Sequence, residues 1–109
     1  MTTFDERENA FEAKLAHDEE LKFKASARRD KKLGLWAAGK LAKSGAAAEE
    51  YASSLISADV AASGDDGVFK KLRADFDQAK VEQSDHQIRR KMEEFFAEAV
   101  EEVKTGVRD

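Results

Sequence analysis

The sequence SDHQIRRKMEEFFAEAVEEVKTG, residues 84–106, has the clearest secondary-structure pattern in the chain. Its apolar side chains recur every three or four residues, which places them on one face of an α-helix. They are Ile88, Met92, Phe95, Phe96, Ala99 and Val103. Ser84 and Gln87 have the spacing of a capping box at a helix start, and Gly106 is a typical residue just beyond a helix end. The pattern predicts a helix over residues 85–104.

Toward the N-terminus, three earlier segments also have helical patterns. Residues 46–62 carry a stripe of small side chains, and residues 69–79 repeat larger apolar side chains with the same period. The two stripes are Ala48, Ala52, Leu55, Asp59 and Ala62, and Phe69, Leu72, Phe76 and Ala79. Residues 19–42 form the first long helix, and its apolar side chains gather near its C-terminal end. They are Leu33, Leu35, Trp36, Ala37, Ala38 and Leu41.

Two glycines, Gly34 and Gly39, interrupt this first helix. Each costs about 1 kcal/mol relative to alanine in a helix interior. They therefore indicate either a bend or a place where another helix packs against bare backbone. We favour close packing, because the stripe of residues 46–62 is rich in alanine. Gly45, after Ser44, is expected to end the first helix, and the short connection favours antiparallel neighbours.

Length and composition support a single all-α domain. The chain has 109 residues, of which 41% are hydrophobic and 39% charged, and it contains neither proline nor cysteine. The absence of cysteine excludes disulfides and thiolate metal sites, and the absence of proline leaves long helices uninterrupted. We predict a four-helix bundle over residues 18–109, preceded by a flexible N-terminal arm over residues 1–17. With no signal peptide and no long apolar segment, a soluble cytoplasmic protein is expected.

The arm has an amphipathic pattern of its own. Thr3 and Glu6 have the spacing of a capping box, and three apolar residues then share one helical face. They are Phe4, Phe11 and Leu15. Burying three side chains yields ~1.5–3 kcal/mol each, whereas ordering each of about fourteen residues costs ~1–2 kcal/mol. The arm therefore needs a partner surface, and two interpretations remain: it folds in the groove of another protein, or it docks on the bundle as an extension.

The residues that would support catalysis are absent. The two histidines are His17 and His86, and neither has the spacing of a metal site. Asp75 and Asp77 lie two residues apart on a helix and point in different directions. We predict no catalytic residue and no metal ligand, and we interpret His86 as a polar residue in the first turn of the last helix. His17, beside the acidic residues 18–20, is a candidate pH-sensitive hinge.

The charges are strongly segregated. Residues 1–21 carry two basic and seven acidic side chains, residues 22–43 carry eight basic and one acidic, and the rest carry nine basic and fifteen acidic. The basic helix 22–43 gives an alternative function, a nucleotide- or RNA-binding module. Its candidate contacts are Arg28, Arg29, Lys32 and Trp36. The net charge of −4 opposes phosphate binding. We favour a basic face that pairs with acids of the bundle and a tryptophan that belongs to the core. The expected acidic partners are Glu49, Glu50, Glu93 and Glu94.

Several motifs resemble one known family. They are FDERE at 4–8, AHDEEL at 16–21, LGLWAA at 33–38, SDH at 84–86 and IRRKM at 88–92. Together they resemble the zeta subunit of the alphaproteobacterial rotary ATP synthase. The resemblance covers nearly the whole chain and is closest over residues 4–45 and 84–96.

This resemblance implies a four-helix bundle whose N-terminal arm inhibits ATP hydrolysis by the synthase. The arm would enter a catalytic alpha/beta interface near the gamma shaft, so the alpha, beta and gamma subunits are the expected partners, and nucleic acid is not. The partner-binding residues would be Phe4, Asp5, Arg7, Glu8, Phe11, Glu12, Lys14 and Leu15. No cofactor is expected to be required, although weak binding of an adenine nucleotide is compatible with this role. A cytoplasmic protein associated with the membrane through the synthase is expected, and a plain assembly subunit is a further alternative.

Overall fold

A computed structural model describes residues 18–62 and 65–106, and this part of the chain is almost entirely helical. Its helices are α2 (Glu19–Lys40), α3 (Gly45–Ala62), α4 (Asp65–Gln78) and α5 (Asp85–Thr105). The described residues contain no strand. The prediction of an all-α fold with four helices behind an N-terminal segment is confirmed, and the predicted ends of the first, second and last helices lie within two residues of the observed ones.

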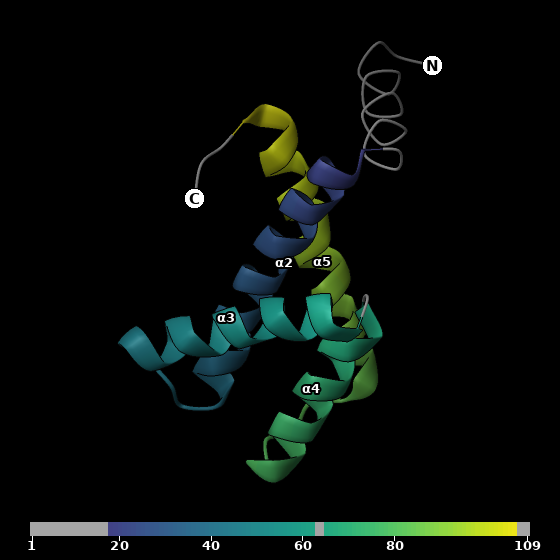
Figure 1. Cartoon of the computed structure of the whole chain (residues 1–109). Coiled ribbons are helices and arrows are strands. Elements are labelled where there is room, and N and C mark those ends of the chain that lie inside the picture. The colour runs from purple at the N-terminus through teal and green to yellow at the C-terminus, as the bar shows by residue number, and fades with distance from the viewer. Residues whose placement is uncertain (1–17, 63–64, 107–109) are drawn as a thin grey trace.

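Helix α2 is the centre of the arrangement. It packs against α3 and against α5, and α3 in turn packs against α4. Figure 1 shows α2 and α5 side by side and running in opposite directions, with α3 lying across α2 and α4 leading away from the end of α3. The start of α2 and the end of α5 therefore lie at the same end of the molecule, far from the end of α4 (Figure 1).

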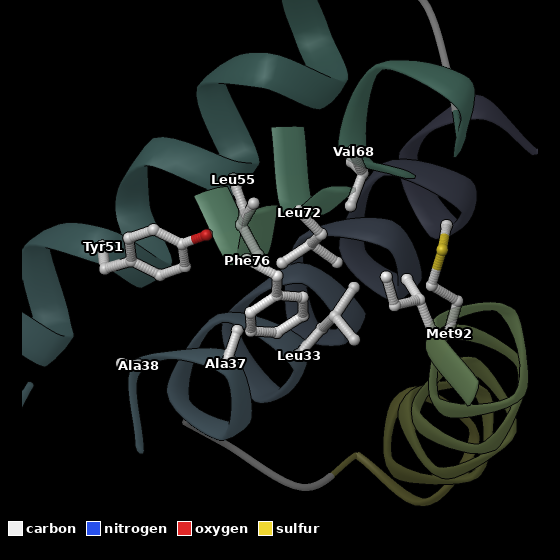
Figure 2. Close-up of a cluster of buried hydrophobic side chains, with 10 residues drawn as sticks. Leu33, Ala37, Ala38, Tyr51, Leu55, Val68, Leu72, Phe76 and Met92 are labelled. Atoms are coloured by element: carbon white, nitrogen blue, oxygen red, sulfur yellow. The ribbon is translucent and has the colours of Figure 1, made fainter. Parts of the chain in front are cut away.

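The core lies where the four helices meet, and every helix contributes to it. Figure 2 shows Leu33 and Phe76 in contact at its centre, with side chains of α3 and α5 around them. The buried cluster comprises Leu33, Ala37, Ala38, Tyr51, Leu55, Val68, Leu72, Phe76, Ile88 and Met92. Trp36 is partly buried and packs edge-on against Phe76, with 5.7 Å between the ring centroids. Leu35, by contrast, is exposed.

At Gly34, which has no side chain, the backbone of α2 packs closely against α3. A Cβ atom at Gly34 would lie 2.5 Å from the Ala52 Cα atom and 2.9 Å from its Cβ atom. The prediction of close packing against bare backbone is therefore confirmed for Gly34. It is wrong for Gly39, where a Cβ atom would meet nothing within 4 Å.

The helix ends depend on local hydrogen bonds. The Asp18 carboxylate accepts from the backbone N–H groups of Glu20 and Leu21. Ser84 and Gln87 form the predicted capping box at the start of α5, and Gly106 ends that helix with a left-handed backbone, φ 76°. These side chains and this glycine satisfy backbone groups that a helix end leaves without partners.

The end of α2 differs from its prediction. Ala42 takes the left-handed conformation just beyond α2, with φ 60°, whereas Gly45, also left-handed with φ 56°, is the first residue of α3. The N–H of Lys43 then donates to the carbonyl of Ala38 at 2.8 Å, which closes the last turn of the helix. The helix consequently stops at Lys40 rather than at residue 42.

Candidate functional site

The candidate partner-binding residues of the arm lie outside the described residues, as does the candidate hinge His17. The arm residues are Phe4, Asp5, Arg7, Glu8, Phe11, Glu12, Lys14 and Leu15. Their roles stay predictions. The described segment that follows them in the sequence is the N-terminal half of α2, residues 19–30, because α2 begins directly after Asp18.

An arginine is buried in this half of α2. Arg29 is 2% exposed, and its guanidinium group contacts carboxylates from three helices. Its Nε atom donates to Asp30 Oδ1 at 2.8 Å and its Nη1 atom to Asp65 Oδ1 at 2.8 Å. The third contact, from Nη2 to Asp59 Oδ2, is longer at 3.4 Å. Arg29 therefore joins α2 to α3 and α4, and it does not present its charge to solvent as a nucleotide contact would.

Asp30, the neighbour of Arg29, is fully buried, and its Oδ2 atom has no hydrogen-bond partner among the described residues. Burial, followed by a hydrogen bond with the Asp59 carboxyl group, raises the pKa of Asp30 to about 8 against the opposing charge of Arg29. Two carboxyl groups share a hydrogen bond only when one is protonated. The burial of Asp30 and the proximity of Asp59 therefore favour the protonated form of the Asp30 carboxyl group, against the attraction of Arg29.

Two further basic residues of α2 pair with α5. Arg28 Nε lies 3.1 Å from Glu102 Oε1, and Lys32 Nζ lies 2.8 Å from Glu102 Oε2. Hydrogen bonds from Lys32 and then from Arg28 lower the pKa of Glu102. A basic face that pairs with acids of the bundle is thus confirmed, but with other partners than expected, since Glu94 pairs within α5 with Arg90 and Lys91.

Trp36 follows Lys32 by one turn on α2. It lines a cavity of about 350 Å³ between α2 and α5, together with Lys40, Gln83, Gln87, Arg90, Lys91 and Glu94. Of the four candidate nucleotide contacts, Trp36 lines this cavity and Arg28, Arg29 and Lys32 do not. Lys40, Arg90 and Lys91 were not predicted as neighbours of Trp36. The IRRKM segment was the available signal, but a single sequence does not give the register between two helices.

A groove runs between the N-terminal half of α2 and the C-terminal part of α3. It has a volume of about 430 Å³, with Phe23, Ile56 and Val60 as its large apolar side chains and Asp30 and Asp59 among its polar ones. Phe23 is 60% exposed and Val60 is 64% exposed, so this apolar surface faces solvent. We call it the α2–α3 groove.

The described residues offer no metal centre. No group of three or more histidine, cysteine or acidic side chains in residues 18–62 and 65–106 has the arrangement needed to hold a metal ion. Asp75 accepts from Tyr51 and Lys71, whereas Asp77 accepts from Arg73, so the two carboxylates serve separate contacts as expected. In the same part of the chain, no helix combines the length and the apolar character that crossing a membrane requires.

Comparison with known proteins identifies a family. The model of the family described as ATPase inhibitor subunit zeta matches residues 1–102. The match spans the N-terminal segment and all but the last few described residues. A search of curated proteins gives no match.

Proposed function

The chain belongs to the ATPase inhibitor subunit zeta family, and on this basis we propose that it inhibits ATP hydrolysis by the catalytic head of a rotary ATP synthase. The observation that carries this proposal is the family match over residues 1–102, which includes the amphipathic arm. We propose further that the protein is cytoplasmic, that its bacterial source is an alphaproteobacterium, and that it reaches the membrane only through the synthase.

In this proposal the arm is the inhibitory element. Residues 1–14 enter a catalytic alpha/beta interface near the gamma subunit, with Phe4 and Phe11 as apolar anchors. Leu15 follows on the same helical face, and charged residues of the arm orient it. Helix formation is coupled to binding, because the arm pattern buries too little surface to stay ordered without a partner surface.

The bundle acts as a rigid stop outside the interface. The Arg29 contacts to α3 and α4 and the Glu102 contacts between α2 and α5 tie the helix that follows the arm to the rest of the domain. A helix held on several sides transmits force from the arm to the whole bundle, so the anchored protein obstructs rotation of the gamma shaft.

The experiment adds purified full-length protein to its cognate ATPase head and measures ATP hydrolysis. We expect inhibition by the full chain and its loss in a chain lacking residues 1–14. Unchanged hydrolysis with the full chain, together with stable association, would favour a plain assembly subunit. Equal inhibition by the shortened chain would contradict the role of the arm.

Point variants test the anchors and the charges. Phe11→Ala and Arg7→Glu are each expected to weaken inhibition several-fold without lowering the helical content of the bundle. Leu35→Ala is the matched control, because Leu35 is an exposed apolar residue on α2 that lines neither cavity. Its inhibition should equal that of the unmodified chain.

A second candidate function, weak binding of an adenine nucleotide, is favoured by the cavity beside Trp36. Lys40, Arg90 and Lys91 supply positive charge there, and the indole offers a surface on which a base can stack. Titration with ATP at two salt concentrations tests it, because contacts with phosphates weaken as salt rises. Lys40→Glu should abolish any binding in this cavity, and binding unaffected by this substitution would place the nucleotide elsewhere.

A further inference from the structure

The α2–α3 groove has the features of a docking site for a helix. Phe23 and Val60 are more than half exposed, although both are large apolar side chains. Ser26 and Ala27 also line the groove, and such small side chains let another backbone approach closely. The groove therefore fits a short amphipathic helix with a few apolar residues on one face.

The chain's own N-terminal segment directly precedes, in the sequence, the helix that forms one side of this groove. The groove begins at Glu19, the first residue of α2, and residues 1–17 are joined to α2 through Asp18. A short tether of this kind raises the effective concentration of the segment to the millimolar range. A weak apolar contact is then populated without any gain in intrinsic affinity.

Length and pattern match as well. Residues 4–15 and residues 19–30 of α2 each comprise twelve residues, so each spans about 18 Å as a helix, at 1.5 Å per residue. In an antiparallel arrangement that turns at residues 16–18, Phe11 lies level with Phe23. Phe4 then lies level with Asp30, at the far end of the groove.

Charges favour the same alignment. Residues 1–21 carry seven acidic side chains, and the helix that follows is strongly basic. Antiparallel pairing places Glu12 level with Lys22, which pairs with the exposed residue Glu19 at 3.6 Å. Arg7 falls level with Ala27, which lines the groove together with Asp59. This alignment thus brings Glu12 to a residue of opposite sign, and Arg7 to a part of the groove that holds an acidic side chain.

We propose that residues 4–15 dock as a helix in the α2–α3 groove of the same molecule, antiparallel to α2, and that this contact withholds the arm from its target. The second half of this statement rests on the proposed function; the docking itself does not. The same apolar face, with Phe4, Phe11 and Leu15, serves both contacts, so the bundle and the ATPase compete for it. The arm leaves the groove before it inhibits the ATPase.

The test uses a spin label on the full-length chain, which has no cysteine of its own. Ser57→Cys places the label at an exposed position of α3 beside the groove, and Gln78→Cys places it at the distant end of α4. We expect the label at position 57, but not that at position 78, to broaden the amide signals of residues 4–15 severely. Absence of broadening from position 57 would overturn the docking.

Substitutions then assign the broadening to the groove. Phe23→Ser combined with Val60→Ser should restore most of the lost signal intensity, whereas Leu35→Ser, on the same helix outside the groove, should leave the broadening unchanged. Broadening that survives the double substitution overturns the proposal. Broadening in a mixture of spin-labelled chains and separate isotope-enriched chains would also overturn the proposal, because the arm of one molecule would then occupy the groove of another.

Hydrolysis measurements test the competition separately. If the arm is withheld, the Phe23→Ser, Val60→Ser variant should inhibit the ATPase at a several-fold lower concentration than the unmodified chain, because a larger fraction of its arms is free. Unchanged potency would overturn the withholding but not the docking. Loss of inhibition in this variant would mean that the groove binds the ATPase instead of withholding the arm. If neither chain inhibits, the proposed function fails while the spectroscopic result still decides the docking.

Discussion

The two halves of α2 are held in place by different forces. In the C-terminal half, Leu33, Ala37 and Ala38 are fully buried against apolar side chains of the other helices. In the N-terminal half, the largest buried side chains are Arg29 and Asp30, and Phe23 is left exposed. Apolar burial supplies most of the stability of a small domain, whereas buried charges contribute little net free energy. The C-terminal half therefore holds the fold, and the N-terminal half keeps an apolar surface free for binding.

The largest effect should separate the two halves directly. Leu33→Ala removes a fully buried side chain and should lower the free energy of unfolding by about 2–5 kcal/mol. Phe23→Ala, in the exposed half, should change it by less than about 1 kcal/mol. Urea denaturation followed by circular dichroism measures both. Equal losses in the two variants would contradict the division of α2 into a structural and an open half.

The next effect contrasts two glycines of the same helix. Gly34→Ala brings a Cβ atom within 2.5 Å of the Ala52 backbone, and the resulting overpacking should cost about 1–3 kcal/mol. Gly39→Ala meets open space and should stabilise the protein by up to about 1 kcal/mol through better helix propensity. Thermal or urea unfolding checks the sign of each change. A stabilising Gly34→Ala would mean that α2 and α3 can move apart freely.

A third prediction concerns pH and the polar half. Because the pKa of Asp30 is raised to about 8 from 3.8, the folded chain keeps a proton that the unfolded chain releases above pH 3.8. Stability should therefore fall as pH rises, by about 1–2 kcal/mol between about pH 5 and pH 8 once coupling to Arg29 is allowed for. Asp30→Asn should flatten this slope. Asp66→Asn, at an exposed position, should retain the slope of the unmodified chain.

The smallest effect is expected at the contact of α2 with α5. Glu102→Gln weakens its pairing with Arg28 and Lys32, and its partial exposure limits the loss to less than about 1 kcal/mol. The lowered pKa of Glu102 means that its contribution is present above its ordinary value and is lost as the pH falls. Acid titration of the two proteins, followed by circular dichroism, should show a slightly steeper loss of stability for the unmodified chain.

The features that could be predicted from the sequence are the local ones. The apolar period of α5 and its capping residues depend on neighbours within one or two turns, so residues 85–104 could be assigned without knowing the rest of the fold. Gly34 was predictable for a related reason. A glycine inside one helix and an alanine-rich stripe on another together indicate that the two helices pack closely. The left-handed Ala42 was not, since any of several residues near Gly45 can close a helix end.

The candidate site was less accessible because its contacts join distant segments. Glu102 rather than Glu94 meets Arg28 and Lys32, and that choice depends on how far α5 is shifted along α2. The burial of Asp30 depends on α3 crossing above it. Neither the shift of α5 along α2 nor the crossing of α3 can be recognised in a single sequence. The amphipathic pattern of the arm can be, and the family match covers that arm.

Trp36, the one tryptophan of the chain, lies at a boundary. Its ring packs nearly perpendicular to that of Phe76 in the core, and the residue also lines the cavity that holds Lys40 and Lys91. Its intrinsic fluorescence therefore reports on two events without any added dye: a shift of emission to longer wavelength when the helices separate, and quenching when a solute enters the cavity. The native chain thus carries its own optical probe for both unfolding and ligand entry.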